Sequence, residues 1–469
     1  MKKFYITTSI AYTNAPPHIG FALECIQADV LARYHKDSYF LTGTDEHGLK
    51  IRKAAEESGK TPKEFTDEIS AKFKDLTKKL NLSNNYFIRT TDEKIHLPAV
   101  NKLWLKLEEN GDIYKKKYKG YYCSGCEAFV TEKDLIDGKC PNHNKEPELV
   151  EEENYFFKLS KYLDKVKKVI EKDELRIIPE SRKNEVLGFI KTGIEDTSFS
   201  RSKDKYWGFS VPNDKEHTIY CWADALPNYI SAIGYAEETK EFKKYWPADI
   251  HCIGKDILKF HALIWPAMLL SLGLDLPKAI FVHGFITVDG KKMSKSIGNV
   301  IDPFELVEKY GADAVRYYLL REIPSTEDGD FTYEKFEARY NSDLASGIGN
   351  LLARVRTMAE KGFKDNNSLK KEINKVKKDY IKAINKFKFN EALQVIWSLI
   401  SICDKYIEKE KPWEKDSPEV LGSLLVCLDN IAELLEPFLP ETAEKIKKEI
   451  ERNTKFINKR GEVLFPRIC

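Results

Sequence analysis

Apolar residues recur in two different rhythms along the N-terminal part of the chain. Residues 4–10 form a run of aromatic, β-branched and hydroxyl side chains, which favours a buried strand. After a turn containing the Pro16–Pro17 pair, apolar residues from Ala22 to Tyr34 return every three or four positions, as in a helix. Residues 39–42 predict a second strand, which ends in the polar segment 43–48. Strand, helix and strand joined by short connections predict a βαβ unit of a parallel sheet.

The residue pattern changes between about residue 114 and residue 221. This segment is rich in lysine and glutamate and contains a cysteine cluster and short strands such as residues 155–159. The βαβ pattern then resumes with a strand at 249–254, an apolar helix to Leu272, a strand at 279–283 and a loop at 289–298. A connection of roughly 100 residues is far longer than an ordinary loop. The sequence therefore predicts an α/β fold, in which one Rossmann-like parallel-sheet domain is split by an insertion.

The rest of the chain is predicted to be all-α. Beyond Asp343, apolar residues recur at helical spacing, and Pro412, Pro418, Pro437 and Pro440 mark the breaks between helices. The expected division is a first half of the sheet domain at 1–113, the insertion at 114–221, the second half at 222–323, a linking segment at 324–345 and a helical bundle at 346–469.

Composition excludes several classes of protein. The chain has 469 residues, about three domains' worth, and 42% of them are apolar, so it is no disordered tail. Its net charge of +2 excludes a strongly basic protein that binds nucleic acid through its overall positive charge. The longest apolar run, residues 263–274, is about half a membrane span, and no signal peptide is recognised. We expect a cytoplasmic protein without membrane segments, and an odd count of nine cysteines argues against a disulfide framework.

Four residues of the insertion have the spacing of a metal site. Cys123 and Cys126 form one pair, and Cys140 and His143 form another after an intervening thirteen residues. Three thiolates and one imidazole suit tetrahedral Zn²⁺, and four protein ligands leave no open position for chemistry. The alternative is four unrelated residues in a polar loop. We expect one structural zinc ion per chain.

Two further motifs are typical of phosphate binding. The segment Pro17-His18-Ile19-Gly20 lies between the first strand and the first helix, where backbone N–H groups and the helix dipole attract phosphate. The segment Lys292-Met293-Ser294-Lys295-Ser296 lies on a glycine-flanked loop whose lysines can neutralise a triphosphate. Each motif alone is also compatible with a turn histidine or a solvated basic loop. Together, in this order, they are specific.

These two motifs resemble the HIGH and KMSKS signatures of class I aminoacyl-tRNA synthetases. The wider match is to the methionyl-tRNA synthetases of that class, in the single-zinc form, over essentially the whole chain. The segments that carry it are 11–14, Thr44-Asp45-Glu46-His47-Gly48, Tyr220-Cys221-Trp222-Ala223-Asp224-Ala225, 253–257 and 260–268. The resemblance implies ATP-dependent activation of L-methionine to methionyl-adenylate and its transfer to the 3' end of tRNA(Met).

The resemblance also assigns residues. The methionine pocket is expected to comprise Ile10, Tyr12, Asp45, Trp222, Ala225, Tyr229, Ile257 and His261, with Asp45 receiving the ammonium group. ATP is expected to bind together with Mg²⁺. The expected ATP-binding residues are His18, Gly20, Glu24, Gly254, Asp256, Lys292, Ser294 and Lys295. His18, Lys292 and Lys295 are the expected catalytic residues, and Lys295 is the main stabiliser of charge on the α-phosphate. Without the resemblance, Trp222, Tyr229 and Ile257 would more readily be ordinary core residues.

The resemblance also assigns residues of the helical bundle, and the chain differs from the family motif at one position. Asn350, Arg354 and Trp413 match the anticodon-reading positions of the family, and lysine runs such as Lys370–Lys371 could track an RNA backbone. The second histidine of the HIGH motif is replaced by Phe21, which cannot donate a hydrogen bond.

Three other readings stay open at this point. Another class I synthetase is one, although the insertion is too small for the large editing module of the branched-aliphatic enzymes. A non-catalytic tRNA-binding paralogue is the second, favoured only by Phe21. The third, a small nucleotidyltransferase, would need no helical bundle. Because the chain ends just after the bundle, with no dimerising module, we expect a monomer.

Overall fold

A computed structural model of the chain describes residues 3–123, 128–130, 135–141, 144–293, 298–359, 362–414, 417–454 and 463–468. Its contacts divide the chain into two compact units. The first unit comprises Met1–Pro17, Asp37–Thr77 and Asn84–Val282. The second unit comprises His18–Lys36, Lys78–Ser83 and His283–Cys469. The helix that follows the Pro17 turn therefore belongs with the C-terminal part of the chain.

A seven-stranded sheet forms the centre of the first unit as far as the described residues extend. Its order is β2 (Ala11–Tyr12), β3 (Ser38–Asp45), β1 (Phe4–Thr8), β13 (Ile250–Gly254), β14 (Ala279–His283) and β8 (Arg176–Ile178), and β4 (Tyr86–Arg89) also pairs with β3. The pairs β1–β3, β1–β13, β2–β3, β3–β4 and β8–β14 are parallel. The predicted split parallel sheet is confirmed. One edge strand, β8, comes from the segment between the two halves.

The central strands are apolar because both of their faces are covered. Every residue of β1, β13 and β14 is buried, as expected for a parallel sheet with packing on both sides. The helices of this unit are α2 (Leu49–Glu57), α3 (Pro62–Lys79), α4 (His96–Glu109), α5 (Leu163–Glu171), α6 (Glu180–Lys191), α7 (Cys221–Ala225), α8 (Asn228–Ser231), α9 (Lys240–Tyr245) and α10 (Trp265–Leu272). Helix α10 ends at Gly273, whose φ of 68° is a left-handed conformation that glycine adopts without strain.

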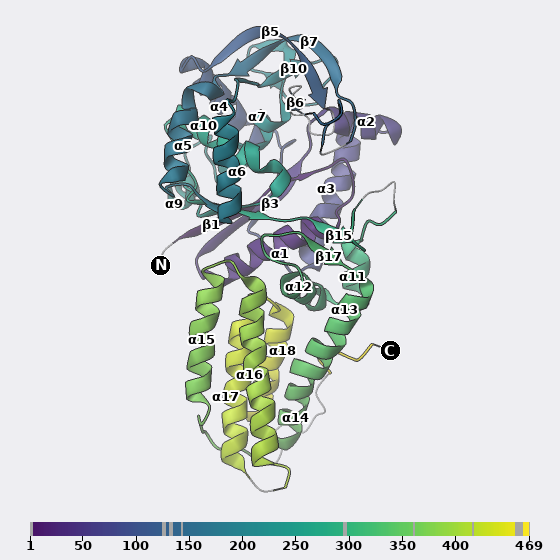
Figure 1. Cartoon of the computed structure of the whole chain (residues 1–469), viewed down its shortest axis with the longest axis vertical. Helices are drawn as coiled ribbons and strands as arrows, with labels where there is room; N and C mark the ends of the chain where they lie inside the picture. The colour runs from purple at the N-terminus through teal and green to yellow at the C-terminus, as the bar shows by residue number, and fades with distance from the viewer. Residues whose placement is uncertain are drawn as a thin grey trace. The chain divides into compact units, whose positions relative to one another are not determined.

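The insertion forms antiparallel strands, and the longest pair is visible as an arched ribbon (Figure 1). Strand β5 (Ile113–Cys123) pairs with β7 (Glu148–Phe157), and β6 (Ala128–Val130) and β9 (Thr197–Ser198) extend the sheet. A smaller sheet contains β10 (Ser200–Ser202), β12 (Asp214–Ile219) and β11 (Ser210–Val211). The strand expected at 155–159 instead runs from Glu148 to Phe157, and Leu159 begins a 3-10 helix. Much of β7 is solvent-exposed and carries glutamates, which conceal its first half in the sequence.

The second unit joins helix α1 (Ile19–Tyr34) to a small sheet and to the helical bundle. Strands β15 (Ile286–Val288), β16 (Lys291–Lys292) and β17 (Gly329–Phe331) form the sheet, so part of the expected loop at 289–298 is a hairpin strand. Helices α11 (Pro303–Tyr310), α12 (Ala312–Arg321) and α13 (Tyr333–Arg339) precede the bundle. Within the described residues, none of the helices combines the length and apolar character needed to traverse a bilayer.

The bundle itself is all-α, as predicted. Helices α15 (Lys370–Ile384), α16 (Phe389–Glu410), α17 (Pro418–Leu435) and α18 (Pro440–Thr454) run side by side, and α14 (Asn350–Ala359) packs against α17 and α18 (Figure 1). Proline opens α17 and α18, where its missing N–H costs no hydrogen bond. Apolar residues at helical spacing, including Leu424, Leu428 and Ile431, are buried between the helices.

Candidate active site

Tyr229 and His261 form a buried, uncharged pair in the first unit. The Tyr229 hydroxyl lies 2.7 Å from Nε2 of His261, and Nδ1 of His261 lies 3.0 Å from the carbonyl oxygen of Ile257. Because the carbonyl can only accept, Nδ1 carries the proton and the Tyr229 hydroxyl donates to Nε2. Burial lowers the pKa of His261 to about 4, so its ring is neutral at neutral pH. The sequence predicted both residues, and the structure brings them together.

Trp222 supplies an aromatic face beside this pair. Its ring stacks on Phe260 with centroids 3.8 Å apart and meets the His261 ring edge-on at 6.1 Å. The indole N–H of Trp222 is buried and has no hydrogen-bond partner among the described residues. Aromatic rings around a neutral donor–acceptor pair suit a polarizable thioether better than a charged side chain. Phe260 was not assigned from the sequence as a pocket residue, although it lies in a segment that carries the family resemblance.

The remaining predicted pocket residues lie at the ends of strands and in short turns. Ile10 and Ile257 are half-buried against the same hydrophobic core as Tyr229, and Ala225 is buried at the end of α7. The parallel register of β2 with β3 places Tyr12 opposite Asp45. Asp45 is buried at the carboxyl end of β3, where parallel sheets bind their ligands.

His18 occupies the cap of α1 in the second unit. Its Nδ1 accepts a hydrogen bond of 3.0 Å from the backbone N–H of Gly20, so the proton of the neutral ring resides on Nε2. A Cβ at position 20 would lie 2.8 Å from Cε1 of His18. A side chain at position 20 would therefore displace the His18 ring, which favours glycine there.

The second signature segment begins beside this cap. The Cε atom of Met293 lies 4.0 Å from the Cβ position of Gly20, and Ile19 donates its backbone N–H to the carbonyl of Ile301 over 3.2 Å. Lys292 is exposed at the end of β16, with Nζ 5.6 Å from the ring centre of Phe285. Ser294 and Lys295 lie outside the described residues. Segments nearly 300 residues apart in sequence thus meet at the start of α1.

Other residues assigned to ATP have distinct surroundings. Glu24 is buried in α1, and its Oε2 lies 2.8 Å from Nε2 of His283, which sequence reasoning did not identify. Gly254 ends β13 in the first unit, and Asp256 follows it in a 3-10 turn with an exposed side chain. An acidic residue in this position after a central strand can accept hydroxyl groups.

The expected zinc ligands are described only in part. Cys123 ends β5, and Cys140 directly follows the turn closed by the Ile136–Lys139 bridge; both cysteines are buried. Cys126 and His143 lie outside the described residues. No group of three metal-ligating side chains occurs among the residues that the structure describes. The donor set of three thiolates and an imidazole still fits Zn²⁺ chemically.

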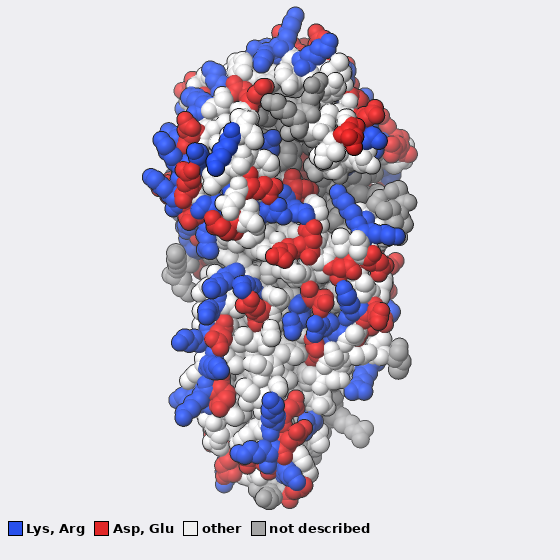
Figure 2. Space-filling view, in the orientation of Figure 1, with Lys and Arg blue, Asp and Glu red and all other residues white. Residues whose placement is uncertain are grey.

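The expected anticodon residues lie in the bundle. Asn350 begins α14 and is exposed, and Arg354, one turn later, pairs with Asp404 over 3.1 Å. Trp413 follows the end of α16 and is 48% exposed, which is unusual for so large an apolar side chain. Lys and Arg side chains gather along α15, at the left edge of Figure 2. Lys370 and Lys371 are exposed at the start of α15, and Lys377 pairs with Glu433 over 2.7 Å.

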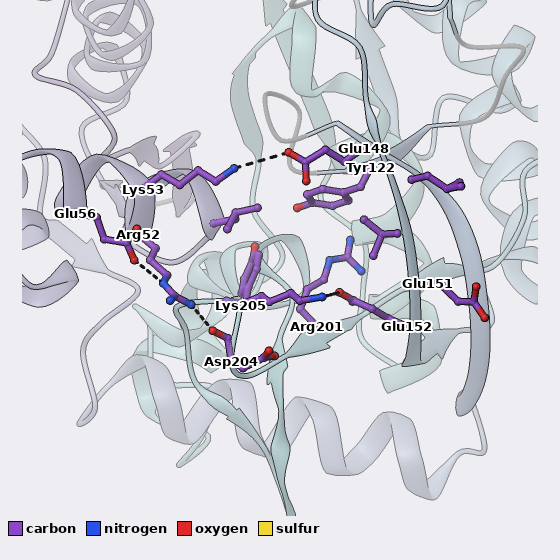
Figure 3. A pocket seen from close by; sticks show the side chains of 14 residues that line it. Arg52, Lys53, Glu56, Tyr122, Glu148, Glu151, Glu152, Arg201, Asp204 and Lys205 are labelled. Atoms are coloured by element: carbon purple, nitrogen blue, oxygen red, sulfur yellow. Dashed lines mark hydrogen bonds and ion pairs between the residues drawn. The ribbon is translucent and has the colours of Figure 1, made fainter.

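A pocket of about 470 Å³ lies elsewhere in the first unit, between α2 and the strands of the insertion (Figure 3). None of the residues assigned from the sequence lines it. Its basic and acidic side chains pair with each other, as in Lys53 with Glu148 at 3.9 Å and Arg52 with Glu56 at 2.9 Å. Because these charges offset one another, the pocket gives no indication of a ligand.

Comparison with known proteins agrees with this arrangement. The sequence profile described as "tRNA synthetases class I (M)" matches residues 4–148 and 132–356, and that of the "Anticodon-binding domain of tRNA ligase" matches residues 366–464. The chain is 46% identical to the methionine--tRNA ligase of Caldanaerobacter subterraneus subsp. tengcongensis, over 100% of this chain and 79% of that protein. It is 45% identical to that of Thermotoga maritima, over 96% of this chain and 75% of that protein.

A solved structure resembles the whole chain. It is the methionyl-tRNA synthetase of Mycobacterium tuberculosis in complex with methionyl-adenylate, with a TM-score of 0.90, 37% sequence identity and coverage of 99% of each chain. The similarity in sequence and the similarity in structure both identify the same family. The chain belongs to the methionine--tRNA ligases of the class I tRNA synthetases.

Proposed function

We propose that this chain joins methionine to tRNA in two steps. The methionine carboxylate attacks the α-phosphate of ATP, which gives methionyl-adenylate and releases pyrophosphate. A hydroxyl group of the terminal ribose of tRNA(Met) then takes the methionyl group, and AMP leaves. Besides family membership, the observation that carries this proposal is the buried, neutral Tyr229–His261 pair beside Trp222. This pair is suited to an uncharged thioether.

Substrate methionine is held by two kinds of contact. The side chain lies among Ile10, Tyr12, Trp222, Ala225, Tyr229, Ile257 and His261 in this proposal. The ammonium group pairs with the carboxylate of Asp45, a charge-assisted contact in a largely buried setting. A pocket without a charged group near the sulfur favours methionine over basic or acidic amino acids, because such side chains would lose their hydration without a partner.

Activation requires positioning and charge neutralisation rather than a protein nucleophile. The Nε2–H of His18 donates to a phosphate oxygen, and Gly20 and Gly254 allow the nucleotide close to the backbone. Lys292, Ser294 and Lys295 contact the phosphates, and the two lysines stabilise the charge that develops on them. Asp256 accepts the ribose hydroxyls, and Glu24 assists on the same side of the nucleotide. Mg²⁺, when bound with ATP, supplies further neutralisation of the phosphates.

Phe21 bears on this first step. It stands where the family motif carries a second histidine, so one potential donor to the phosphates is missing. The backbone N–H groups of Ile19 and Gly20 at the start of α1 already donate to Ile301 and His18, so a water molecule is the donor that we expect in place of the histidine. Replacing Phe21 with His should then leave the rate of activation within about threefold, whereas a larger gain would show that the missing donor limits the enzyme.

A structural zinc ion in the insertion is the second part of the proposal. Cys123, Cys126, Cys140 and His143 would hold it, one ion per chain. Plasma mass spectrometry of the purified protein should find one zinc per chain, and Cys140→Ser should lower that ratio. The buried free thiol Cys403 offers a matched control, because Cys403→Ser should leave the zinc content unchanged.

The bundle recognises the anticodon in this proposal. Trp413 stacks on an unpaired base, while Asn350 and Arg354 reach base edges. We further propose that the chain works as a monomer in the cytoplasm, where protein synthesis takes place. Light scattering of the purified protein should give about 54 kDa, and a stable mass twice as large would contradict the monomer.

Methionine-dependent exchange of pyrophosphate into ATP tests the activity directly. Each of the twenty amino acids is supplied in turn, and exchange is expected with methionine alone. Lys295→Ala should abolish it, whereas Lys291→Ala, which removes an exposed lysine from the same hairpin, should not. Exchange with a different amino acid would show that the pocket has the specificity of another class I synthetase. No exchange from a folded, zinc-replete protein would favour the tRNA-binding paralogue.

A further inference from the structure

Three consecutive side chains at the end of β3 are anchored in different directions. The carboxylate of Glu46, which is fully buried, accepts two hydrogen bonds from Arg89, at 2.7 and 2.8 Å. Nδ1 of His47 lies 2.8 Å from Oδ2 of Asp224. Asp45 precedes them both, and its Oδ1 lies 3.4 Å from the backbone N–H of His47. The position of Asp45 therefore depends on how its two neighbours are held.

The partner of His47 belongs to the other wall of the methionine pocket. Asp224 lies in α7, between Trp222 and Ala225. The hydrogen bond of His47 with Asp224 joins residues 177 positions apart in sequence and ties the end of β3 to α7. It thus connects the carboxylate that pairs with the ammonium group to the aromatic face that contacts the side chain.

A second histidine strengthens the connection. Nε2 of His96, the first residue of α4, lies 3.3 Å from Oδ1 of Asp224 and 3.0 Å from its carbonyl oxygen. Nδ1 of His96 lies 2.9 Å from the hydroxyl of Ser231 in α8, the helix that carries Tyr229. Burial raises the pKa of Asp224, but the interactions with His47 and His96 outweigh it and lower the pKa to about 2. Asp224 is therefore a buried carboxylate.

Aromatic packing fixes the orientation of the His47 ring. The ring meets Phe209 edge-on with centroids 4.6 Å apart and Trp207 at 5.7 Å. The indole N–H of Trp207 donates to the carbonyl oxygen of Glu46 over 2.8 Å. Rotating the His47 side chain away from Asp224 would disturb its contacts with both aromatic rings. Aromatic packing on one side of the ring and the hydrogen bond on the other therefore hold β3 against α7.

We propose that His47, acting through Asp224, is a positioning residue that sets the place of Asp45 relative to Trp222 and Ala225. It thereby selects ligands that carry an ammonium group. The inference rests on the proposed function, because it takes Asp45 as the partner of the methionine ammonium. His47 itself does not touch the substrate in this account. Its loss weakens the contact between Asp45 and the ammonium group, while the contacts to the thioether chain stay.

Two ligands separate these contacts. L-Methionine uses both the ammonium contact and the side-chain contacts, whereas 4-(methylthio)butanoic acid has the same chain and carboxylate without the amino group. In the pyrophosphate-exchange assay, His47→Ala should raise the KM for methionine by about 10- to 100-fold, the size of effect that a small misplacement produces. The KM for ATP should change less than about twofold. The inhibition constant of 4-(methylthio)butanoic acid should likewise stay within about twofold of its wild-type value.

A conservative variant and a matched control make the test specific. His47→Asn keeps a donor near the position of Nδ1 and should restore most of the affinity for methionine. The control is His217→Ala, which breaks another histidine–aspartate pair of the same unit, His217 with Asp214 at 3.1 Å, in β12. This control should change neither the KM for methionine nor the inhibition constant of 4-(methylthio)butanoic acid. If His47→Ala does not fold, Asp224→Asn replaces it, with the same difference expected between the two ligands.

The possible outcomes separate the inference from the function on which it rests. Equal weakening of methionine and of 4-(methylthio)butanoic acid by His47→Ala would overturn the inference, since a merely structural role would disturb both. Unchanged values for both ligands would also overturn it. A wild-type protein without methionine-dependent exchange would overturn the proposed function instead, and no comparison of variants would then be needed.

Discussion

The hydroxyl of Tyr229 donates to Nε2 of His261 over 2.7 Å, and both side chains are only 1% exposed. Replacing Tyr229 with Phe removes the donor and leaves a buried imidazole nitrogen without it. An unsatisfied buried acceptor costs about 1–3 kcal/mol. We therefore expect Tyr229→Phe to lower the free energy of unfolding by that amount in urea titrations, and to raise the KM for methionine in pyrophosphate exchange.

The control for this variant is Tyr235→Phe. Tyr235 is buried in the same core, but no hydrogen bond from its hydroxyl is recorded in the described part of the chain. Its replacement should cost less than about 0.5 kcal/mol and leave the KM for methionine unchanged. An equal effect of both variants would contradict the special role of the pair.

His261 should make stability depend on pH over a defined window. Burial lowers its pKa from 6.5 to about 4 in the folded protein. The unfolded chain therefore binds a proton below about pH 6.5 while the folded protein does not, so the stability contribution present above pH 6.5 is lost as the pH falls toward 4. The loss amounts to about 3 kcal/mol across this window.

The measurement compares wild type with His261→Gln, because other groups also titrate in this range. The difference between the two free energies of unfolding should change by about 3 kcal/mol in favour of the variant as the pH falls from 7 to 4. Glutamine can still accept from Tyr229 through its amide oxygen. A difference that stays constant with pH would show that His261 titrates normally in the folded protein.

Gly20 should be intolerant of a methyl group because of its neighbour His18. A Cβ at this position would meet Cε1 of the His18 ring at 2.8 Å, so the ring must move. We expect Gly20→Ala to lower kcat in pyrophosphate exchange by about 10- to 100-fold, with little change in the KM for methionine. Gly188→Ala is the matched control, because a Cβ at this helical glycine of α6 meets nothing within 4 Å. That variant should be fully active and no less stable than wild type.

Arg316 and Asp29 form a fully buried ion pair in the second unit, with a nitrogen–oxygen distance of 2.7 Å. The guanidinium also donates to the carbonyl oxygens of Phe438, Pro437 and Leu80. It thus connects α12 to α1 and to the turn between α17 and α18. Without Arg316, the buried Asp29 keeps Arg33 and Ser83 as partners but loses its buried cation, and three carbonyl oxygens lose their donor. Arg316→Met should therefore lower the free energy of unfolding by about 3–5 kcal/mol.

The comparison for Arg316 is an exposed pair of the same unit. Lys364 lies 3.2 Å from Glu419, and the two side chains are 69% and 53% exposed. Exposed pairs contribute little because water screens them, so Lys364→Met should change the free energy of unfolding by less than about 1 kcal/mol. Urea unfolding of both variants under the same conditions checks the contrast.

Trp413 should affect tRNA and not the first step of the reaction. Its ring is 48% exposed, and stacking of a base on an aromatic ring is worth about 1–3 kcal/mol. Trp413→Ala should raise the KM for tRNA by about 5- to 150-fold and leave pyrophosphate exchange unchanged. Trp413→Phe, which keeps an aromatic face, should recover much of the loss. Ile381→Ala removes another exposed apolar side chain of the bundle, 46% exposed, and should alter neither reaction.

The parallel sheet and the bundle could be predicted from short-range patterns. Residues 279–283 are apolar throughout because β14 is covered on both faces, and the helical spacing of Leu424, Leu428 and Ile431 follows from one buried side of α17. The chemistry-bearing segments around His18 and Lys292 were likewise recognisable, since each is continuous in sequence. Local patterns reveal what local geometry requires.

Pairing between distant segments needed the folded chain. Strand β8 is only three residues long and lies in a lysine-rich segment, so nothing in its pattern indicates that it pairs with β14. His47 and Asp224, 177 positions apart, look in the sequence like unrelated polar residues of two motifs, yet folding buries them against each other. Hydrophobic periodicity predicts whether a residue faces the core, but it does not predict which polar side chain will be its hydrogen-bond partner there. That depends on which segments the fold brings into contact.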